Sequence, residues 1–305
     1  MPTWFAYALL KPHWVIPEGT CLPKSFGERV SLKEIIPVVS EISEADNLRH
    51  LIQQEMDSEG IRHCLAVEYE TNEPPGFLEN RPHEWSAHDE AQQQARSAHM
   101  ALWLIRPTPL TFTTVAIAER KGQELNTCAV TTYGPTFTLG TSASKDYNAE
   151  DLNAASLAFK ALMRASMQGP VRTAGLVITK LLCDSTWEFR FLLMWLAMES
   201  LFGPEDSRET SFRLSQRVAL FLESDPIRSN ELFRKVKDSY SWRSKIVHGF
   251  RLAKLNDEKL LGLLLEMEDV LRRGMLTILN SEERLAIFDG PSRESYLDGL
   301  AFRHS

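Results

Sequence analysis

The sequence predicts an α+β protein, in which a mixed N-terminal part is followed by an all-helical part. Before about residue 145, short β-like runs alternate with helical patterns, whereas later segments carry apolar residues three and four positions apart and contain no convincing strand. The 305 residues are 43% hydrophobic and 25% charged, which is typical of globular proteins and leaves room for two domains. We predict a mixed α/β domain at 1–145, a helical bundle at 146–290 and a weakly ordered tail at 291–305.

The first part contains several short runs that are rich in aromatic and β-branched residues or that alternate in polarity. The predicted strands are 4–10, 13–16, 63–70, 110–118 and 127–133. Two segments have helical spacing instead: 43–56, with Ser43 as its N-cap, and 84–105, which ends before Pro107. The proline-rich stretch 72–82 between them predicts a loop.

The second part begins after a polar stretch at 139–148, which is the expected domain boundary. Each later segment with helical spacing is predicted to form one helix of a bundle. These segments are 152–167, 172–182, 187–202, 211–223, 227–237 and 257–279.

Composition and motifs exclude several classes of protein. The formal net charge of −7 argues against a protein that coats long stretches of nucleic acid. The four cysteines lie far apart, which fits neither a zinc site nor a disulfide scaffold and suggests a reducing cytoplasm. The apolar opening run has no basic leader, and the most apolar later stretch is too short to cross a bilayer, so no membrane contact is expected. His83, His88 and His99 match no helical ligand pattern, and we predict neither a metal nor a cofactor.

Polar chemistry is concentrated in residues 240–249. This stretch holds Tyr240, Arg243, Ser244, Lys245 and His248. Its neighbourhood is basic although the whole chain is acidic, which would favour a phosphate ligand. The basic neighbours are Arg228, Arg234, Lys235, Lys237, Arg251 and Lys254.

A carboxylate stands out in the apolar segment 187–202. Its stripe of Phe191, Trp195, Met198 and Phe202 predicts bundle core, and Glu199 lies beside that stripe. The sequence leaves two alternatives: Glu199 lies at the helix edge in water, or a buried cation holds it.

Three stretches together carry a family resemblance. The segments 195–202 (Trp-Leu-Ala-Met-Glu-Ser-Leu-Phe), 217–219 (Arg-Val-Ala) and 243–249 (Arg-Ser-Lys-Ile-Val-His-Gly) resemble the Apea-like branch of the HEPN superfamily over roughly the last 120 residues. The resemblance implies a helical bundle that is often dimeric, and in many members a metal-independent ribonuclease built on Arg, four to six residues, then His. Arg243 and His248, with four residues between them, match that pattern.

The resemblance implies an endoribonuclease that uses the RNA's own 2′-hydroxyl, with Arg243 and His248 as catalytic residues. Glu199, Tyr240, Ser244 and Lys245 are then expected to support the site or bind RNA. The implied partners are RNA, a second copy of the chain and a defence or antitoxin protein, because such proteins serve in RNA processing, toxin systems or phage defence. Other members have lost the pair and act only as binding or scaffold modules, which is the alternative function.

Helix geometry bears on this prediction. Residues five positions apart on an α-helix point about 140° away from each other, so Arg243 and His248 would not share a face. Either the helix begins irregularly, or a second subunit completes the site, as the resemblance favours. A third alternative is that His248 and Gly249 merely end a helix, with the histidine interacting with the helix dipole.

Overall fold

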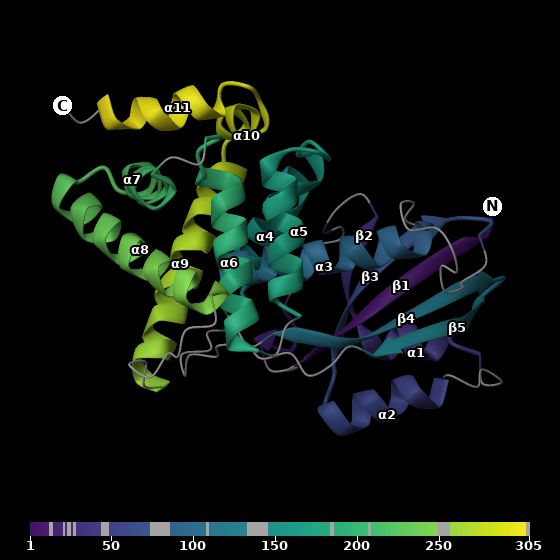
Figure 1. The fold of residues 1–305 in the computed structure, drawn as a ribbon. Helices are drawn as coiled ribbons and strands as arrows, with labels where there is room; N and C mark the ends of the chain where they lie inside the picture. Colours follow the sequence, from purple (N-terminus) through teal and green to yellow (C-terminus); the bar gives the residue numbers. More distant parts are fainter. Residues whose placement is uncertain are drawn as a thin grey trace. The chain divides into compact units, whose positions relative to one another are not determined.

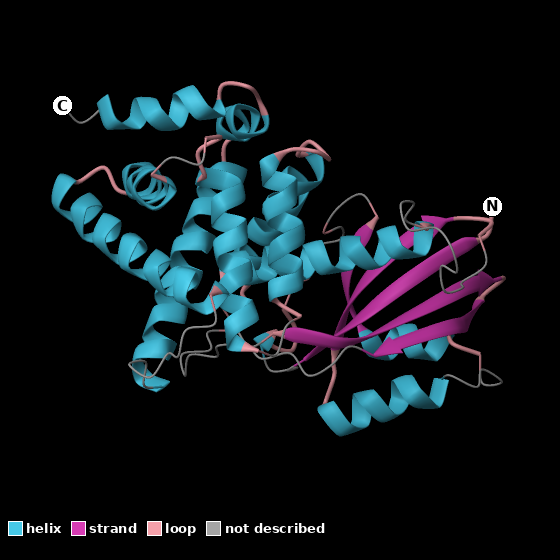
Figure 2. Cartoon of the chain, viewed as in Figure 1, coloured by secondary structure: helices cyan, strands magenta, loops and turns pink. Residues whose placement is uncertain are grey.

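The computed structural model describes residues 1–11, 15–20, 22, 26, 29–43, 49–73, 86–107, 110–132, 146–183, 186–206, 209–248 and 257–302. An antiparallel sheet and a set of helices (Figures 1 and 2) confirm the predicted α+β class. The chain divides into two compact units, Met1–Lys160 and Ala161–Ser305. The division falls inside helix α4 (Ala149–Arg164) rather than at the predicted 145/146.

The first unit is built on a five-stranded sheet in the order β2-β3-β1-β4-β5, and every neighbouring pair is antiparallel. Its strands are β1 (Thr3–Lys11), β2 (Val30–Glu34), β3 (His63–Glu70), β4 (Thr111–Lys121) and β5 (Glu124–Thr132). Four of them confirm predicted strands, and β2 was not predicted. Of the predicted strand 13–16, Val15 and Ile16 lie outside any strand, and the other two positions fall outside the described residues.

Helices cover both faces of this sheet (Figure 1). On one face, α1 (Ile35–Glu41) and α2 (Arg49–Glu59) share a buried core with alternate residues of β1 such as Phe5 and Leu9. On the other face lies α3 (Ala87–Ile105), whose His88 contacts Trp4 edge to face at 5.0 Å. Successive side chains of a strand point to opposite faces, so β1 is buried on both sides.

The described histidines of α3 have structural partners. His88 joins Tyr69 Oη through Nδ1 (2.7 Å) and the Glu73 carbonyl through Nε2 (3.0 Å). His99 donates from Nε2 to the Leu110 carbonyl at 2.6 Å. His83 falls outside the described residues. In the part of the chain that the structure describes, no three His, Cys, Asp or Glu side chains are grouped as a metal site requires.

We expect the first unit to lose stability in mild acid because of His99. Burial lowers the pKa of His99 from 6.5 to about 4, against a partial offset from its hydrogen bond to Leu110. The unfolded chain therefore binds a proton between these two values that the folded chain does not. Above pH 6.5, where the neutral imidazole prevails in both states, this group does not reduce the free energy of unfolding. As the pH falls from 6.5 to about 4, up to about 3 kcal/mol of that free energy is lost.

Urea denaturation at several pH values between 4 and 7 measures this loss. The control is His99→Gln, which keeps an N–H donor for the Leu110 carbonyl but does not titrate. The free energy of unfolding of the variant should fall less than that of the wild type over this range. Parallel pH profiles for the two proteins would exclude His99 as the cause.

The second unit is helical throughout its described residues. After the end of α4, it consists of α5 (Pro170–Leu181), α6 (Trp187–Phe202), α7 (Thr210–Leu222), α8 (Pro226–Val247), α9 (Asp257–Leu279), α10 (Glu282–Asp289), α11 (Arg293–Gly299) and the 3₁₀ turn η2 (Leu300–Phe302). The helical segments predicted for this half are all present, and α8 runs ten residues past its predicted end at 237. None of the described helices has the length and apolar character needed to cross a membrane.

The core of this unit surrounds α6, whose stripe of Phe191, Trp195, Met198 and Phe202 is buried as predicted. The same core contains an ion pair. Arg190 of α6 donates to Glu268 Oε1 of α9 from Nη2 (2.6 Å) and from Nε (3.1 Å), and the two side chains are 1% and 4% exposed. Burial raises the pKa of Glu268 although Arg190 acts to lower it.

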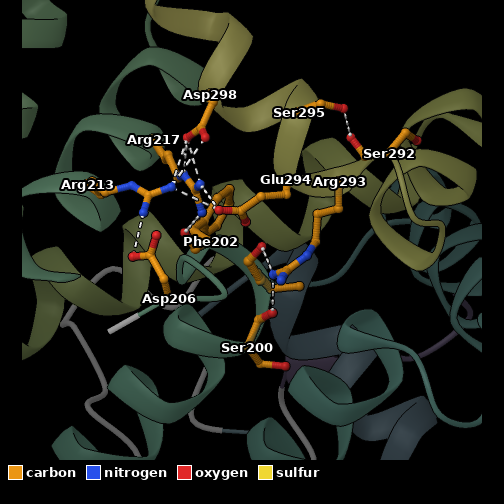
Figure 3. Close-up of polar contacts among 11 residues, drawn as sticks. Ser200, Phe202, Asp206, Arg213, Arg217, Ser292, Arg293, Glu294, Ser295 and Asp298 are labelled. Carbon is orange, nitrogen blue, oxygen red and sulfur yellow. Dashed lines mark hydrogen bonds and ion pairs between the residues drawn. The ribbon is translucent and has the colours of Figure 1, made fainter. Parts of the chain in front are cut away.

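Residues 291–302 are ordered, so the prediction of a weakly ordered tail was wrong for this segment. Two arginines of α7 hold α11 (Figure 3): Arg217 binds Glu294 (2.6 Å) and Asp298 (2.7 Å), and Arg213 binds the same two carboxylates. Arg293 in turn donates to the carbonyls of residues 200 and 201 at the C-terminal end of α6, where a cation is favourable. Tertiary ion pairs to residues about eighty positions away order this segment.

Candidate functional site

Helix α8 carries the predicted catalytic pair in regular helical geometry. Asp225 caps its first turn by accepting a hydrogen bond from the Arg228 N–H (2.9 Å), and Pro226 occupies the first helical position. The helix then continues to Val247, and the N–H of His248 reaches the Ser244 carbonyl at 3.1 Å. The helix is therefore regular from Arg243 to its end, which removes the alternative of an irregular segment. Within one chain, Arg243 and His248 point to different sides of α8.

Arg243 lies against α6 and forms an ion pair with Glu199. Its Nη2 is 3.2 Å from each carboxylate oxygen, and the two side chains remain 30% and 22% exposed. The guanidinium carbon lies 5.6 Å from the centre of the Tyr240 ring, which in turn packs edge to face on Trp195 at 5.0 Å. Of the two alternatives for Glu199, water or a buried cation, the second holds in part: a cation binds Glu199, but the ion pair is half-buried. We call Glu199, Tyr240 and Arg243 the α6–α8 cluster.

The α6–α8 cluster perturbs its tyrosine. Burial raises the pKa of Tyr240, the Glu199 carboxylate raises it further, and Arg243 acts to lower it. Glu199→Gln removes one negative charge beside the phenol, so we expect the pKa of Tyr240 to fall. Ultraviolet titration of tyrosinate in the wild type and in this variant measures the change, and Tyr240→Phe identifies which titration belongs to Tyr240. An unchanged titration curve in Glu199→Gln would contradict this electrostatic coupling.

The other three predicted site residues are turned away from the α6–α8 cluster: relative to Arg243, they lie about 100° (Ser244), 140° (His248) and 200° (Lys245) around α8. His248 is exposed at the C-terminal end of the helix. Lys245 is exposed, with Nζ 3.9 Å from the Trp242 ring centre. Ser244 is half-buried. The structure therefore brings together Glu199, Tyr240 and Arg243 and places the remaining residues on another side of the helix.

The predicted basic neighbourhood is only partly available to a ligand. Lys235 pairs with Glu266 of α9 at 3.1 Å. Arg228 and Arg234 are exposed and form no ion pair among the described residues. Gly249, Arg251 and Lys254 lie outside the described residues.

A second feature of α8 was not predicted. Lys237 lies beside two aromatic rings, with Nζ 5.7 Å from the centre of Phe212 and 5.6 Å from that of Phe233. Next to it is an open hollow of about 450 Å³, lined by Glu209, Thr210, Ser211, Phe212 and Lys237. Lys237 was noted in the sequence only as one basic neighbour. The pairing of α7 with α8, which brings Phe212 to it, is a tertiary contact that helical periodicity does not reveal.

Comparisons of this chain with protein-family models, with curated proteins and with solved structures find no match.

Proposed function

We propose that this protein is a metal-independent endoribonuclease of the HEPN type, with Arg243 and His248 as its catalytic residues. The observation that carries the proposal is that both side chains are at least partly exposed to solvent. Glu199 and Tyr240 fix the position of Arg243 while leaving it 30% exposed, and His248 is exposed at the end of the same helix. Both groups are accessible to a phosphate, and neither is enclosed in the core.

The proposed reaction is attack by the RNA's 2′-oxygen on the adjacent phosphorus. The 2′-hydroxyl gives up its proton, the new 2′-O–P bond forms, the P–O5′ bond breaks, and the 5′-oxygen gains a proton. An imidazole can exchange these protons near neutral pH. A guanidinium stays charged and offers paired donors to the phosphate oxygens, whose charge grows during attack. The products are a 2′,3′-cyclic phosphate and a 5′-hydroxyl.

The proposal requires a second copy of the chain. Because Arg243 and His248 point about 140° apart on a regular helix, one chain does not present both to the same phosphate. In a two-fold dimer, each subunit contributes the same patch, so the arginine of one subunit can meet the histidine of the other. We therefore propose a homodimer with two composite sites.

The experiment uses purified full-length protein and mixed single-stranded RNA in EDTA. We expect cleavage that yields 2′,3′-cyclic phosphate ends, and none when the RNA is replaced by 2′-O-methyl RNA of the same sequence. Arg243→Ala and His248→Ala, purified in the same way, control for contaminating nucleases. Cleavage that persists in either variant, or that requires added metal, would refute the proposal.

A second candidate function is a non-catalytic RNA- or nucleotide-binding module. It is favoured by the ion pair itself, since Glu199 partly neutralises Arg243 and joins α6 to α8 whether or not catalysis occurs. This function predicts RNA binding that weakens with salt and no turnover.

In either case, we propose a role in a cytoplasmic defence or toxin system, with the first unit sensing a ligand or partner. RNA cleavage or RNA binding that appears only with a neighbouring gene product would support that role.

A further inference from the structure

On the solvent-exposed side of α8, the cationic Lys237 lies on the same helix face as His248. The two positions Lys237 and His248 are eleven residues apart, which is three helical turns plus about 20°, so they lie on the same face at a separation of about 16 Å along the axis. Both side chains are exposed. Arg234, also exposed, is one turn before Lys237 and about 60° around the helix. Arg243 is not on this face, because it points to α6.

An exposed aromatic ring flanks this row of polar side chains. Phe212 of α7 is 43% exposed although it packs against Phe233 in a T-shaped pair with the ring centres 5.3 Å apart, and it borders the hollow of about 450 Å³ next to Lys237. Exposed phenyl rings beside a cation suit single-stranded nucleic acid, because a base stacks on the ring while its phosphate meets the positive charge. Glu209 also lines the hollow and offers an oxygen that can accept from an amino group of a base.

The charges of this face complement a phosphate backbone. Arg234 and Lys237 form no ion pair among the described residues, whereas Lys235, on the far side of the helix, is paired with Glu266. Two acidic residues of α8, Glu231 and Asp238, are turned at least 100° away from Lys237 but lie only about 60° and 40° from Arg234. Among the described residues of α8, no carboxylate therefore lies one turn before or after Lys237 on its own face, and Lys237 is the main cation of this face for a phosphate.

We propose that single-stranded RNA binds along this face, which we call the α7–α8 track and define as Phe212, Arg234, Lys237 and His248. One base stacks on Phe212, its phosphate lies by Lys237 and Arg234, and the strand continues along α8 to His248. This inference rests on the proposed function, in that it names the path by which the substrate reaches one of the catalytic residues. A separation of about 16 Å leaves room for a few nucleotides between the stacking position and the histidine.

The test is fluorescence anisotropy of the full-length protein with labelled 2′-O-methyl RNA, which cannot be cut through its 2′-oxygen. Phe212→Leu keeps apolar volume but removes the ring, and we expect it to weaken binding about tenfold, since stacking contributes about 1–3 kcal/mol per base. Lys237→Gln should weaken binding and lower the slope of log K against log salt by about 0.7. The matched control, Lys235→Gln, removes the same charge two residues away and should change affinity less than twofold. Circular dichroism spectra of the three variants confirm that they are folded.

Equal losses of RNA affinity in Lys237→Gln and Lys235→Gln, or unchanged affinity in Phe212→Leu, would refute RNA binding along the α7–α8 track. The outcome is separable from that of the proposed function. RNA that binds along the track but is never cut by the wild type refutes the nuclease and supports the track. RNA that is cut with unchanged KM in both Phe212→Leu and Lys237→Gln supports the nuclease and refutes the track.

Discussion

A mixed dimer that contains one Arg243→Ala subunit and one His248→Ala subunit should cleave RNA at about half the wild-type rate, although either variant alone is nearly inactive. Loss of one donor to a developing oxyanion typically lowers kcat about 100- to 1000-fold, and loss of a proton-transferring group lowers it about 100- to 10000-fold. In the mixed dimer, the intact arginine and the intact histidine meet in one of two composite sites. One working site of two gives half the rate.

The mixed dimer is obtained by co-expressing the two variants with different affinity tags and purifying through both tags. Its control is a mixed dimer of wild type with the double variant Arg243→Ala/His248→Ala. If the sites are composite, each site of this control lacks one group and the control is inactive. If each chain carries its own complete site, the results are exchanged: the control retains half the rate and the first mixed dimer has none. That exchange would exclude the composite site while leaving the roles of the two residues intact.

The helices with a clear apolar stripe were predicted best. The ranges of α6 and α9 match their predicted segments residue for residue, because burial on the apolar side decides where each helix begins and ends. The end of α8 was missed for the opposite reason. Beyond residue 237, its inward positions include Ser239 and Arg243, which are polar and continue no apolar stripe.

Two elements of the sheet unit were missed because their signal is not local. Strand β2 has only five residues and ends in Lys33 and Glu34, and its pairing with β3 is a long-range contact. Helix α1 is short and contains Pro37, which in a sequence indicates a break rather than a helix. Pro37 lies within the first turn, where its missing N–H removes no helical hydrogen bond.

Only part of the candidate site could be predicted from residues that are close together in the sequence. Helix arithmetic predicted that Arg243 and His248 diverge, because both belong to one helix. It did not choose between water and a cation for Glu199, since the answer depends on how α6 packs against α8. Only the packed helices show that Arg243 is the cation, and that Lys237 meets Phe212 on α7.

Replacing Arg190 with methionine should destabilise the second unit by about 3–5 kcal/mol. Methionine fills much of the same volume, but the buried Glu268, 4% exposed, would lose its ion-pair partner and keep the weaker attraction of Arg272. Breaking a buried ion pair from one side is costly for this reason, whereas replacing both partners with apolar residues is often close to neutral. We therefore expect Arg190→Met/Glu268→Leu to be more stable than Arg190→Met alone.

Hydrogen exchange in α6 and α9 is the measurement of choice, because it reports the opening free energy of these helices separately from the first unit. The pH dependence gives an independent check. Burial already raises the pKa of Glu268, and loss of Arg190 should raise it further. A carboxyl whose folded pKa lies above its unfolded value favours folding at low pH and loses that contribution as the pH rises through the folded value. The free energy of unfolding that Arg190→Met loses relative to the wild type should thus be smallest in acid and largest near neutral pH. A double variant no more stable than Arg190→Met would contradict the view that the unpaired Glu268 carboxylate causes the loss, and a double variant less stable than the wild type would show that the ion pair contributes more than the desolvation of its two charges costs.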